Sequence, residues 1–256
     1  MKFFIAANTD VGTTKSVNQD SVLVKQMRLG RHNIALAVVC DGMGGGSYGE
    51  VASASVAHCM NDWAEKNLEG MIQRGARRDE LKNSWTEIIT AINRKMLNYG
   101  RSRGFVLGTT ASVLLLVDDQ YYIMNIGDGR VYEIRKNHIS QLTLDQTVVA
   151  REVRMGIITP EQAASDPRRN LLLQSVGASA EIVPDFFYGK VYRSSVFLTC
   201  SDGFRHVISS EEIMNAFNPE QIDSKIALRR RADEMIRLNK QRHERDNISV
   251  ALIRTY

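Results

Sequence analysis

The sequence has few cysteines and no long apolar run. The cysteines are Cys40, Cys59 and Cys200, and no two of them form a C-x-x-C pair. This low and odd count argues against a disulfide framework or a cysteine-based zinc site. No segment approaches the roughly 18 apolar residues that a membrane span requires. The apolar start MKFFIAANTDVG is too short for a secretion signal, so we expect a cytoplasmic protein without a membrane span.

The charge of the chain is also nearly balanced. Its 33 Lys and Arg residues face 29 Asp and Glu residues, and the basic residues are scattered apart from small clusters at 74–78 and 229–231. We expect these clusters to be solvated faces, with docking of acidic or phosphorylated partners as the alternative, and no nucleic acid as partner. No repeat, low-complexity segment or linker is evident, so we expect one domain over residues 1–256, acting as a monomer.

Short strand-like runs dominate the sequence. Expected strands cover 3–7, 21–27, 34–40, 111–117, 121–126, 131–135, 182–188, 195–199 and 248–253. The links at 118–120, 127–129 and 136–137 are too short for a parallel crossover, and therefore predict an antiparallel meander.

Helices are expected to be few and mostly long. They cover 47–68, 79–99, 210–217 and 219–239. Ser209 with Glu212 matches a capping box, and so does Thr159 with Gln162. Because one helical pair interrupts the strands and another lies in the last third of the chain, the pattern favours an α+β fold with helices packed on antiparallel sheets.

The stretch ALAVVCDGMGGGSYGEVASASV, residues 35–56, contains a G-x-G-x-x-G pattern between a strand and a helix. A dinucleotide site also requires a second strand with an acidic residue about 20 positions further on. Here that region is still helical. Glycine is equally favoured where backbone must approach a ligand or metal closely, and this draws attention to Asp41 at the end of the strand.

Aspartates recur at the ends of apolar strands. They are Asp20, Asp41, Asp128, Asp202 and Asp246. A single aspartate at such a position is usually a turn residue. If the strands bring several together, each pair of like charges at 4 Å costs on the order of 4 kcal/mol at an effective dielectric of about 20. Such a cluster persists when cations fill it, and all-oxygen ligands suit Mg²⁺ or Mn²⁺.

Several of these segments together resemble a known family. In order along the chain they are NQDSVLV, VVCDGMGGGSYGEVAS, GTTASVLLL, NIGDGRVYEI, LTLDQ, LTCSDGFRHVISSEEI and RDNISVALI. This order is similar to that of the metal-dependent protein phosphatases, the type 2C serine/threonine phosphatases, in their short bacterial form. The resemblance spans about residues 8–253. It implies an α-β-β-α sandwich, in which two antiparallel sheets are flanked by helical pairs.

The resemblance also implies a centre of two Mn²⁺ or Mg²⁺ ions. By motif position, Asp41 bridges the ions, the carbonyl of Gly42 ligates one of them, and Asp202 and Asp246 complete the other. The implied reaction is hydrolysis of phosphoserine and phosphothreonine in proteins by a water that bridges the metals.

Further positions follow from the same resemblance. Asp20 would hold metal-bound water from outside the direct ligands, and Asp128 would belong to a third, weaker metal site shared with Asp202. Asn247 would orient the loop that carries Asp246. Lys15 stands where the family usually has a phosphate-binding Arg, so we expect it to contact phosphate as a point charge rather than through a bidentate fork.

The resemblance identifies residues 145–177 as the flap, a subdomain beside the active site that influences substrate choice. Gln146 departs from the usual His at the base of this segment, and Gly129 departs from the usual Ser of GDSR. No histidine falls on a motif position, and we expect all of them, including His206, to be surface or packing residues.

Three functions stay open at this point. The first is an active phosphatase that opposes a bacterial Ser/Thr kinase. The second is a pseudophosphatase or sensor module that binds a partner without turnover, although Asp41, Gly42, Asp202 and Asp246 are intact. The third is the same chemistry directed at the phosphoserine of an anti-sigma-factor antagonist.

Overall fold

The computed structural model describes residues 1–44, 48–75 and 77–256. Part of the glycine-rich loop, Gly45 to Ser47, lies outside the described residues, and so does the predicted first residue of the helix that follows. No helix in the described ranges combines the length and apolarity needed to cross a membrane.

Two antiparallel sheets form the centre of the molecule. The first has the strand order β1 (Phe3–Asp10), β11 (Ile248–Thr255), β10 (Val196–Cys200), β7 (Arg130–Arg135) and β8 (His138–Gln141). The second has the order β2 (Asp20–Leu29), β3 (His32–Gly44), β5 (Ala111–Val117), β6 (Gln120–Ile126) and β9 (Asp185–Lys190). A short strand that the sequence did not predict, β4 (Leu107–Thr109), pairs with the end of β3.

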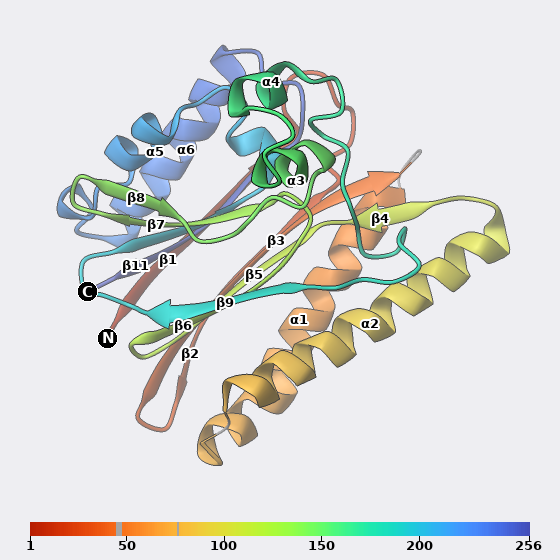
Figure 1. Cartoon of the computed structure of the whole chain (residues 1–256). Helices are drawn as coiled ribbons and strands as arrows, with labels where there is room; N and C mark the ends of the chain where they lie inside the picture. Colours follow the sequence, from red (N-terminus) through yellow and green to blue (C-terminus); the bar gives the residue numbers. More distant parts are fainter. Residues whose placement is uncertain (45–47, 76) are drawn as a thin grey trace.

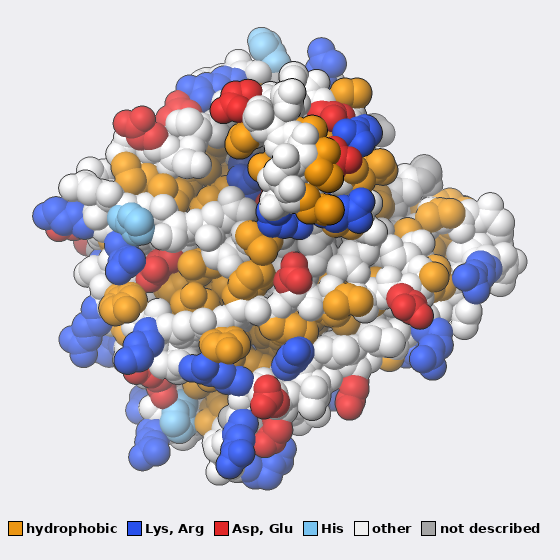
Figure 2. Space-filling model, in the orientation of Figure 1, with side chains coloured by type: hydrophobic (Ala, Val, Ile, Leu, Met, Phe, Trp, Pro, Cys, Tyr) orange, Lys and Arg blue, Asp and Glu red, His pale blue; other side chains and the backbone are white. Residues whose placement is uncertain are grey.

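Helices cover both outer faces of the sheets (Figure 1). On one side lie α1 (Tyr48–Gln73) and α2 (Arg78–Arg103), and on the other lie α5 (Ser210–Ala216) and α6 (Lys225–Gln241). This arrangement confirms the predicted α+β sandwich. On the face shown in Figure 2, basic side chains are scattered among acidic and apolar ones rather than gathered in a stripe.

Strand β3 shows why the central run ALAVVC is apolar without alternation. Ala35, Ala37 and Val39 are buried between the two sheets. The residues between them, Leu36 and Val38, are buried against α1 and α2. A strand covered on both faces needs apolar side chains at every position. Asp41 follows directly after the last of these buried apolar residues.

Two expectations about connections are wrong. The link 127–129 does not turn within one sheet, because β6 belongs to the second sheet and β7 to the first. Gly127 has a φ of 96°, a conformation that favours glycine, where the chain passes between the layers. The expected helix 219–239 is divided: a 3₁₀ turn (Pro219–Gln221) ends in extended backbone, and α6 begins after Ser224, whose side chain accepts a hydrogen bond from the Ala227 N–H.

Two short helices follow β8 within residues 145–177. They are α3 (Val148–Arg154) and α4 (Pro160–Ser165). The predicted capping box of Thr159 and Gln162 is present at the start of α4, and that of Ser209 and Glu212 is present at the start of α5. The segment, which we call the flap segment, returns to the sheets through an isolated bridge between Val176 and Thr109.

Candidate metal centre and active site

The five aspartates lie at one end of the space between the sheets. Neighbouring antiparallel strands run in opposite directions, so the start of β2 and the end of β3 meet at the same edge. Asp20 is directly opposite Asp41 in this register. Asp41 has the same parity along β3 as Ala37 and Val39, so its side chain belongs to the inter-sheet face.

The first sheet contributes its aspartates at the same end. Asp202 follows β10 in a 3₁₀ turn (Asp202–Phe204), and Asp246 precedes β11. Asp20 links the sheets, because its Oδ2 accepts a hydrogen bond of 2.9 Å from the Ser201 hydroxyl beside Asp202. Asp128 lies where the chain crosses from β6 to β7.

The backbone around Asp41 is fixed on both sides. The Asp41 N–H donates to the Thr110 hydroxyl, and the Asp41 carbonyl accepts from the N–H of Thr110, each at 2.9 Å. The Gly42 N–H donates to the Gln19 carbonyl at 3.1 Å. A Cβ at position 42 would lie 2.1 Å from the Gly49 carbonyl oxygen, so only glycine fits this approach between β3 and α1.

Asp246 is held by a loop with many internal contacts. Its Oδ1 accepts a 2.9 Å hydrogen bond from the Asn247 N–H and lies 3.2 Å from the Lys15 ammonium. The Asn247 amide in turn accepts from the Gln19 N–H at 2.8 Å and donates to the Val11 carbonyl at 3.0 Å. Asn247 therefore ties the Asp246 loop to the segment between β1 and β2 that carries Lys15.

Burial and repulsion between neighbouring carboxylates raise the pKa of several aspartates in the cluster. Burial raises the pKa of Asp41 well above its ordinary range, and the charges of Asp20, Asp202, Asp128 and Asp246 act in the same direction. Burial also raises the pKa of Asp20 to about 7. The structure thus places all five aspartates within one electrostatic environment.

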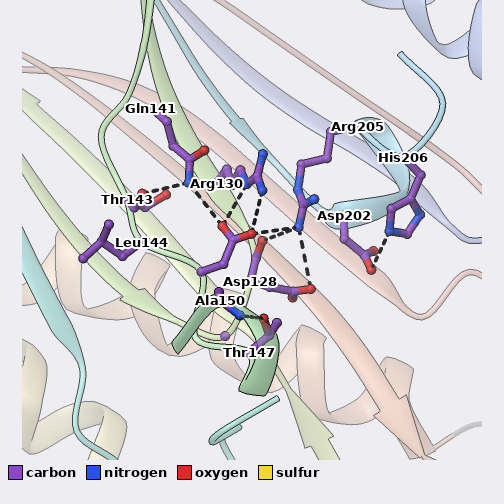
Figure 3. Close-up of polar contacts among 12 residues, drawn as sticks. Asp128, Arg130, Gln141, Thr143, Leu144, Thr147, Ala150, Asp202, Arg205 and His206 are labelled. Atoms are coloured by element: carbon purple, nitrogen blue, oxygen red, sulfur yellow. Dashed lines mark hydrogen bonds and ion pairs between the residues drawn. The ribbon is translucent and has the colours of Figure 1, made fainter. Parts of the chain in front are cut away.

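Asp202 differs because it has a cationic partner. Its burial opposes ionisation, but the hydrogen bond and the charge of His206 outweigh that effect and bring the pKa of Asp202 to about 2. The His206 Nε2 lies 3.2 Å from Asp202 (Figure 3). The Nδ1 of the same ring lies 3.5 Å from Glu244. Sequence reasoning assigned His206 only a surface or packing role. Its position four residues after Asp202 was the one available signal.

The donor set fits hard divalent cations. Asp20 Oδ1 and Asp202 Oδ1 are both buried and have no hydrogen-bond partner among the described residues. Buried carboxylate oxygens are costly unless they are paired or coordinate a metal. Within the described ranges, no three His, Cys, Asp or Glu side chains are already gathered as a ligand set. Repulsion between carboxylates opposes such gathering, and a bound cation would remove that repulsion.

A second polar network, which sequence reasoning missed, connects the flap segment to this site. Arg130 binds Asp145 through two hydrogen bonds, of 2.8 and 2.6 Å. The Arg205 guanidinium lies 3.7 Å from the Asp128 carboxylate and donates to the Asp128 carbonyl at 3.1 Å (Figure 3). It also lies 3.6 Å from Asp145. Burial raises the pKa of Asp128 to about 7, and Arg205 opposes that shift only in part.

Gln146, at the start of the flap segment, is a buried connector. Its side-chain carbonyl accepts from the Gly127 N–H, and its amide donates to Asp185, each at 2.9 Å. It also accepts from the Gln174 amide at 2.9 Å, near the other end of the flap segment. This neutral amide therefore joins the crossing between the sheets to both ends of the flap segment.

Two cavities lie between the flap segment and the strand ends. One of about 560 Å³ is lined by Asp128, Arg205 and the apolar residues of α3 and α4. The other, of about 430 Å³, is lined by Lys15, Arg169 and Asp246 among others. His206 borders both. The two cavities therefore reach Asp128 and Asp246 of the aspartate cluster beside the flap segment.

The chain is similar to known proteins along nearly its whole length. A model of the family described as protein phosphatase 2C matches residues 12–252. The protein phosphatase PhpP of Streptococcus pneumoniae is 32% identical over 251 residues, which cover 97% of this chain and 96% of PhpP. The S. agalactiae serine/threonine phosphatase has a TM-score of 0.88 at 28% identity and full coverage of both chains. The catalytic domain of PstP in complex with two manganese ions has a TM-score of 0.76 at 26% identity, covering 98% of this chain and 97% of that one.

Proposed function

The chain belongs to the protein phosphatase 2C family of serine/threonine phosphatases, and we propose that it hydrolyses phosphoserine and phosphothreonine in proteins with two Mn²⁺ or Mg²⁺ ions. One observation carries this proposal beyond family membership. Acidic side chains from both sheets meet at one end of the sandwich, and buried oxygens of Asp20 and Asp202 have no partner among the described residues. Family members use divalent metals, and the related PstP domain binds two manganese ions.

In the proposed site, Asp41, the carbonyl of Gly42, Asp202 and Asp246 would hold the two ions, and Asp20 would hold water beside them. Asp128 would contribute to a third ion. When bound, the ions supply a deprotonated water as nucleophile and neutralise the phosphoryl oxygens. Lys15 stands at the rim, 3.2 Å from Asp246, where its ammonium can contact the substrate phosphate.

The other side chains position these groups. Asn247 fixes the loop of Asp246 against the Lys15 segment, as its hydrogen bonds to Gln19 and Val11 support. His206 contacts both Asp202 and Glu244 through its two ring nitrogens, so Glu244 holds His206 and His206 orients Asp202. We propose that the flap segment, residues 145–177, borders the substrate, which agrees with the cavities on its inner side. The phosphorylated substrate must come from a protein kinase, which this enzyme would oppose.

The test is hydrolysis of a phosphothreonine peptide with Mn²⁺, with Mg²⁺ and with EDTA, for the unaltered protein and for Asp202→Asn. Turnover should require metal and fall by several orders of magnitude in the variant, because a metal ligand and the partner of His206 are both lost. Asp62→Asn is the matched control, since Asp62 is exposed on α1 and pairs with Lys66. A folded protein without turnover under any of these conditions would favour a binding module instead.

A further inference from the structure

The cavity of about 430 Å³ beside Asp246 is lined by two arginines, Arg169 and Arg245, that the proposed reaction does not use. Its walls come from the segment after β1, from the flap segment and from the loop before β11. Its lining includes Lys15, Arg169, His206, Glu244, Arg245 and Asp246. A cavity of this size lies within the range of about 300–1,000 Å³ that is usual for ligand sites.

Both carboxylates that line this cavity, those of Glu244 and Asp246, already have partners. Glu244 is buried, and its Oε1 accepts hydrogen bonds from the N–H groups of Arg245 and Asp246, at 2.8 and 2.9 Å. Its other oxygen lies 3.5 Å from His206. Asp246 contacts Lys15 and belongs to the proposed metal ligands. The acids therefore leave the arginines of the cavity unneutralised.

Arg169 and Arg245 have no ion-pair partner in the parts of the chain that the structure describes. Both are exposed. Their neighbours in sequence differ: Arg168 pairs with Glu152 and Asp166, each at 2.8 Å, and Arg242 pairs with Glu212. Free guanidinium groups offer two parallel N–H donors, the geometry that suits a phosphate or a carboxylate.

The loops that present these cations are joined to each other. The Thr14 hydroxyl donates to the Arg245 carbonyl at 2.6 Å, and the Thr13 N–H donates to the Glu244 carbonyl at 3.2 Å. Lys15 and Arg245 are therefore presented by two joined loops, and Arg169 of the flap segment borders the same cavity. An anion bound here lies next to the phosphate that Lys15 and the metal site would take.

We propose that this cavity is a subsite for an anionic side chain of the phosphoprotein substrate, next in space to the phosphoresidue that is hydrolysed. The proposal rests on the function proposed above. A second phosphoresidue and a glutamate share the required chemistry, and the dianionic phosphate would bind more tightly because it carries more charge and more acceptor oxygens.

The test compares phosphothreonine peptides that carry glutamine, glutamate or phosphoserine at two to four residues on either side of the phosphothreonine. With Mn²⁺, we expect the best phosphoserine peptide to exceed its glutamine counterpart in kcat/KM by about three- to tenfold, and the glutamate peptide to fall between them. In the double variant Arg169→Gln with Arg245→Gln, that ratio should fall toward one. Arg229→Gln is the control, because Arg229 is exposed on α6 and also lacks an ion-pair partner among the described residues.

Equal kcat/KM for charged and neutral peptides, or a ratio that survives in the double variant, would overturn the subsite. Absence of turnover with every peptide would instead overturn the proposed function. In that case, fluorescence anisotropy still decides the subsite. The doubly phosphorylated peptide must bind more tightly than the singly phosphorylated one, and that difference must vanish in the double variant and persist in Arg229→Gln.

Discussion

Asp20 and Asp41 are paired directly opposite each other on adjacent strands, on the face that points between the sheets. Like charges at directly opposite positions destabilise a sheet. Antiparallel pairing nonetheless fixes them there, because a shift of one residue would turn the apolar side chains of β3 to the wrong faces. The register that buries the core therefore also creates the acidic end of the sandwich, and the fold carries this electrostatic cost until cations neutralise it.

Replacement of Asp20 should separate stability from metal binding. We expect Asp20→Asn to raise the free energy of unfolding of the metal-free protein by about 1–3 kcal/mol at pH 8, because it removes a buried charge. Urea unfolding in EDTA measures this change. The same variant should gain less thermal stability from Mn²⁺ than the unaltered protein. A variant that is less stable without metal, while the control Asp62→Asn is unchanged, would contradict this expectation.

The pH dependence of the metal-free protein follows from two raised pKa values. The pKa of Asp20 and that of Asp128 are each about 7 in the folded protein, against an ordinary aspartate value of 3.8. The folded state thus binds protons more tightly, so stability from these groups is full below about pH 4 and is lost as the pH rises through 7. In EDTA, we expect a higher Tm at pH 6 than at pH 8.5.

The stabilisation by metal should depend on pH in the opposite direction. Cations compete with protons for these carboxylates, so binding releases protons and strengthens as the pH rises. The increase in Tm caused by Mn²⁺ should therefore be larger at pH 8.5 than at pH 6. Thermal scans with and without Mn²⁺ at both pH values test this. A Tm increase that is independent of pH would show that the ions do not interact with the carboxylates of Asp20 and Asp128.

Gly42→Ala should destabilise the protein strongly. The added Cβ would lie 2.1 Å from the Gly49 carbonyl oxygen and 2.5 Å from the Gln19 carbonyl oxygen, both of which are backbone atoms. We expect a loss of about 2–4 kcal/mol in the free energy of unfolding and weaker Mn²⁺ binding. Gly70→Ala is the control, because among the described residues outside its own helix backbone its Cβ would meet only the flexible end of Arg74, and alanine favours the helix. Similar stabilities for the two variants would contradict the tight approach of β3 to α1.

Glu244→Ala should loosen the loop of Asp246. The variant leaves the N–H groups of Arg245 and Asp246 without their acceptor, at a cost of about 1–3 kcal/mol. Calorimetric titration with Mn²⁺ should then show weaker binding, and Glu244→Gln, which retains an acceptor oxygen, should restore part of it. Glu220→Ala is the control at an exposed ion pair with Lys136. Unchanged Mn²⁺ affinity in Glu244→Ala would argue that the loop is fixed by Asn247 alone.

Local patterns in the sequence were enough for much of the fold. The continuous apolar run of β3, the turn at 118–120 and the capping box of Ser209 with Glu212 each depend on residues close in sequence, and each is present. The division of the last long helix was missed because the cap at Ser224 competes with a pattern that is otherwise helical. The crossing at 127–129 was missed because the choice of sheet is a long-range property that no short turn reveals.

The same division applies to the candidate site. Its aspartates could be singled out because strand ends converge in an antiparallel sandwich. Their supporting partners could not be identified in this way. Arg205 contacts Asp128 and Asp145, which are distant in sequence, and Glu244, which follows α6, contacts His206, which precedes α5. Contacts of this kind depend on the assembled layers rather than on spacing along the chain.

The strand order of the first sheet has a consequence for biosynthesis. β1 emerges first from the ribosome, but it joins its sheet only through β11, which lies between β1 and β10. A nascent chain that has exposed Asp202 but not Ile248 therefore has no place for β1, and its Lys15 segment lacks the Asn247 contacts that anchor it. Pairing between the two ends of a chain is slow to form. The proposed cation site therefore depends on the last strand of the chain, because Asp246 directly precedes β11 and β1 pairs with β11.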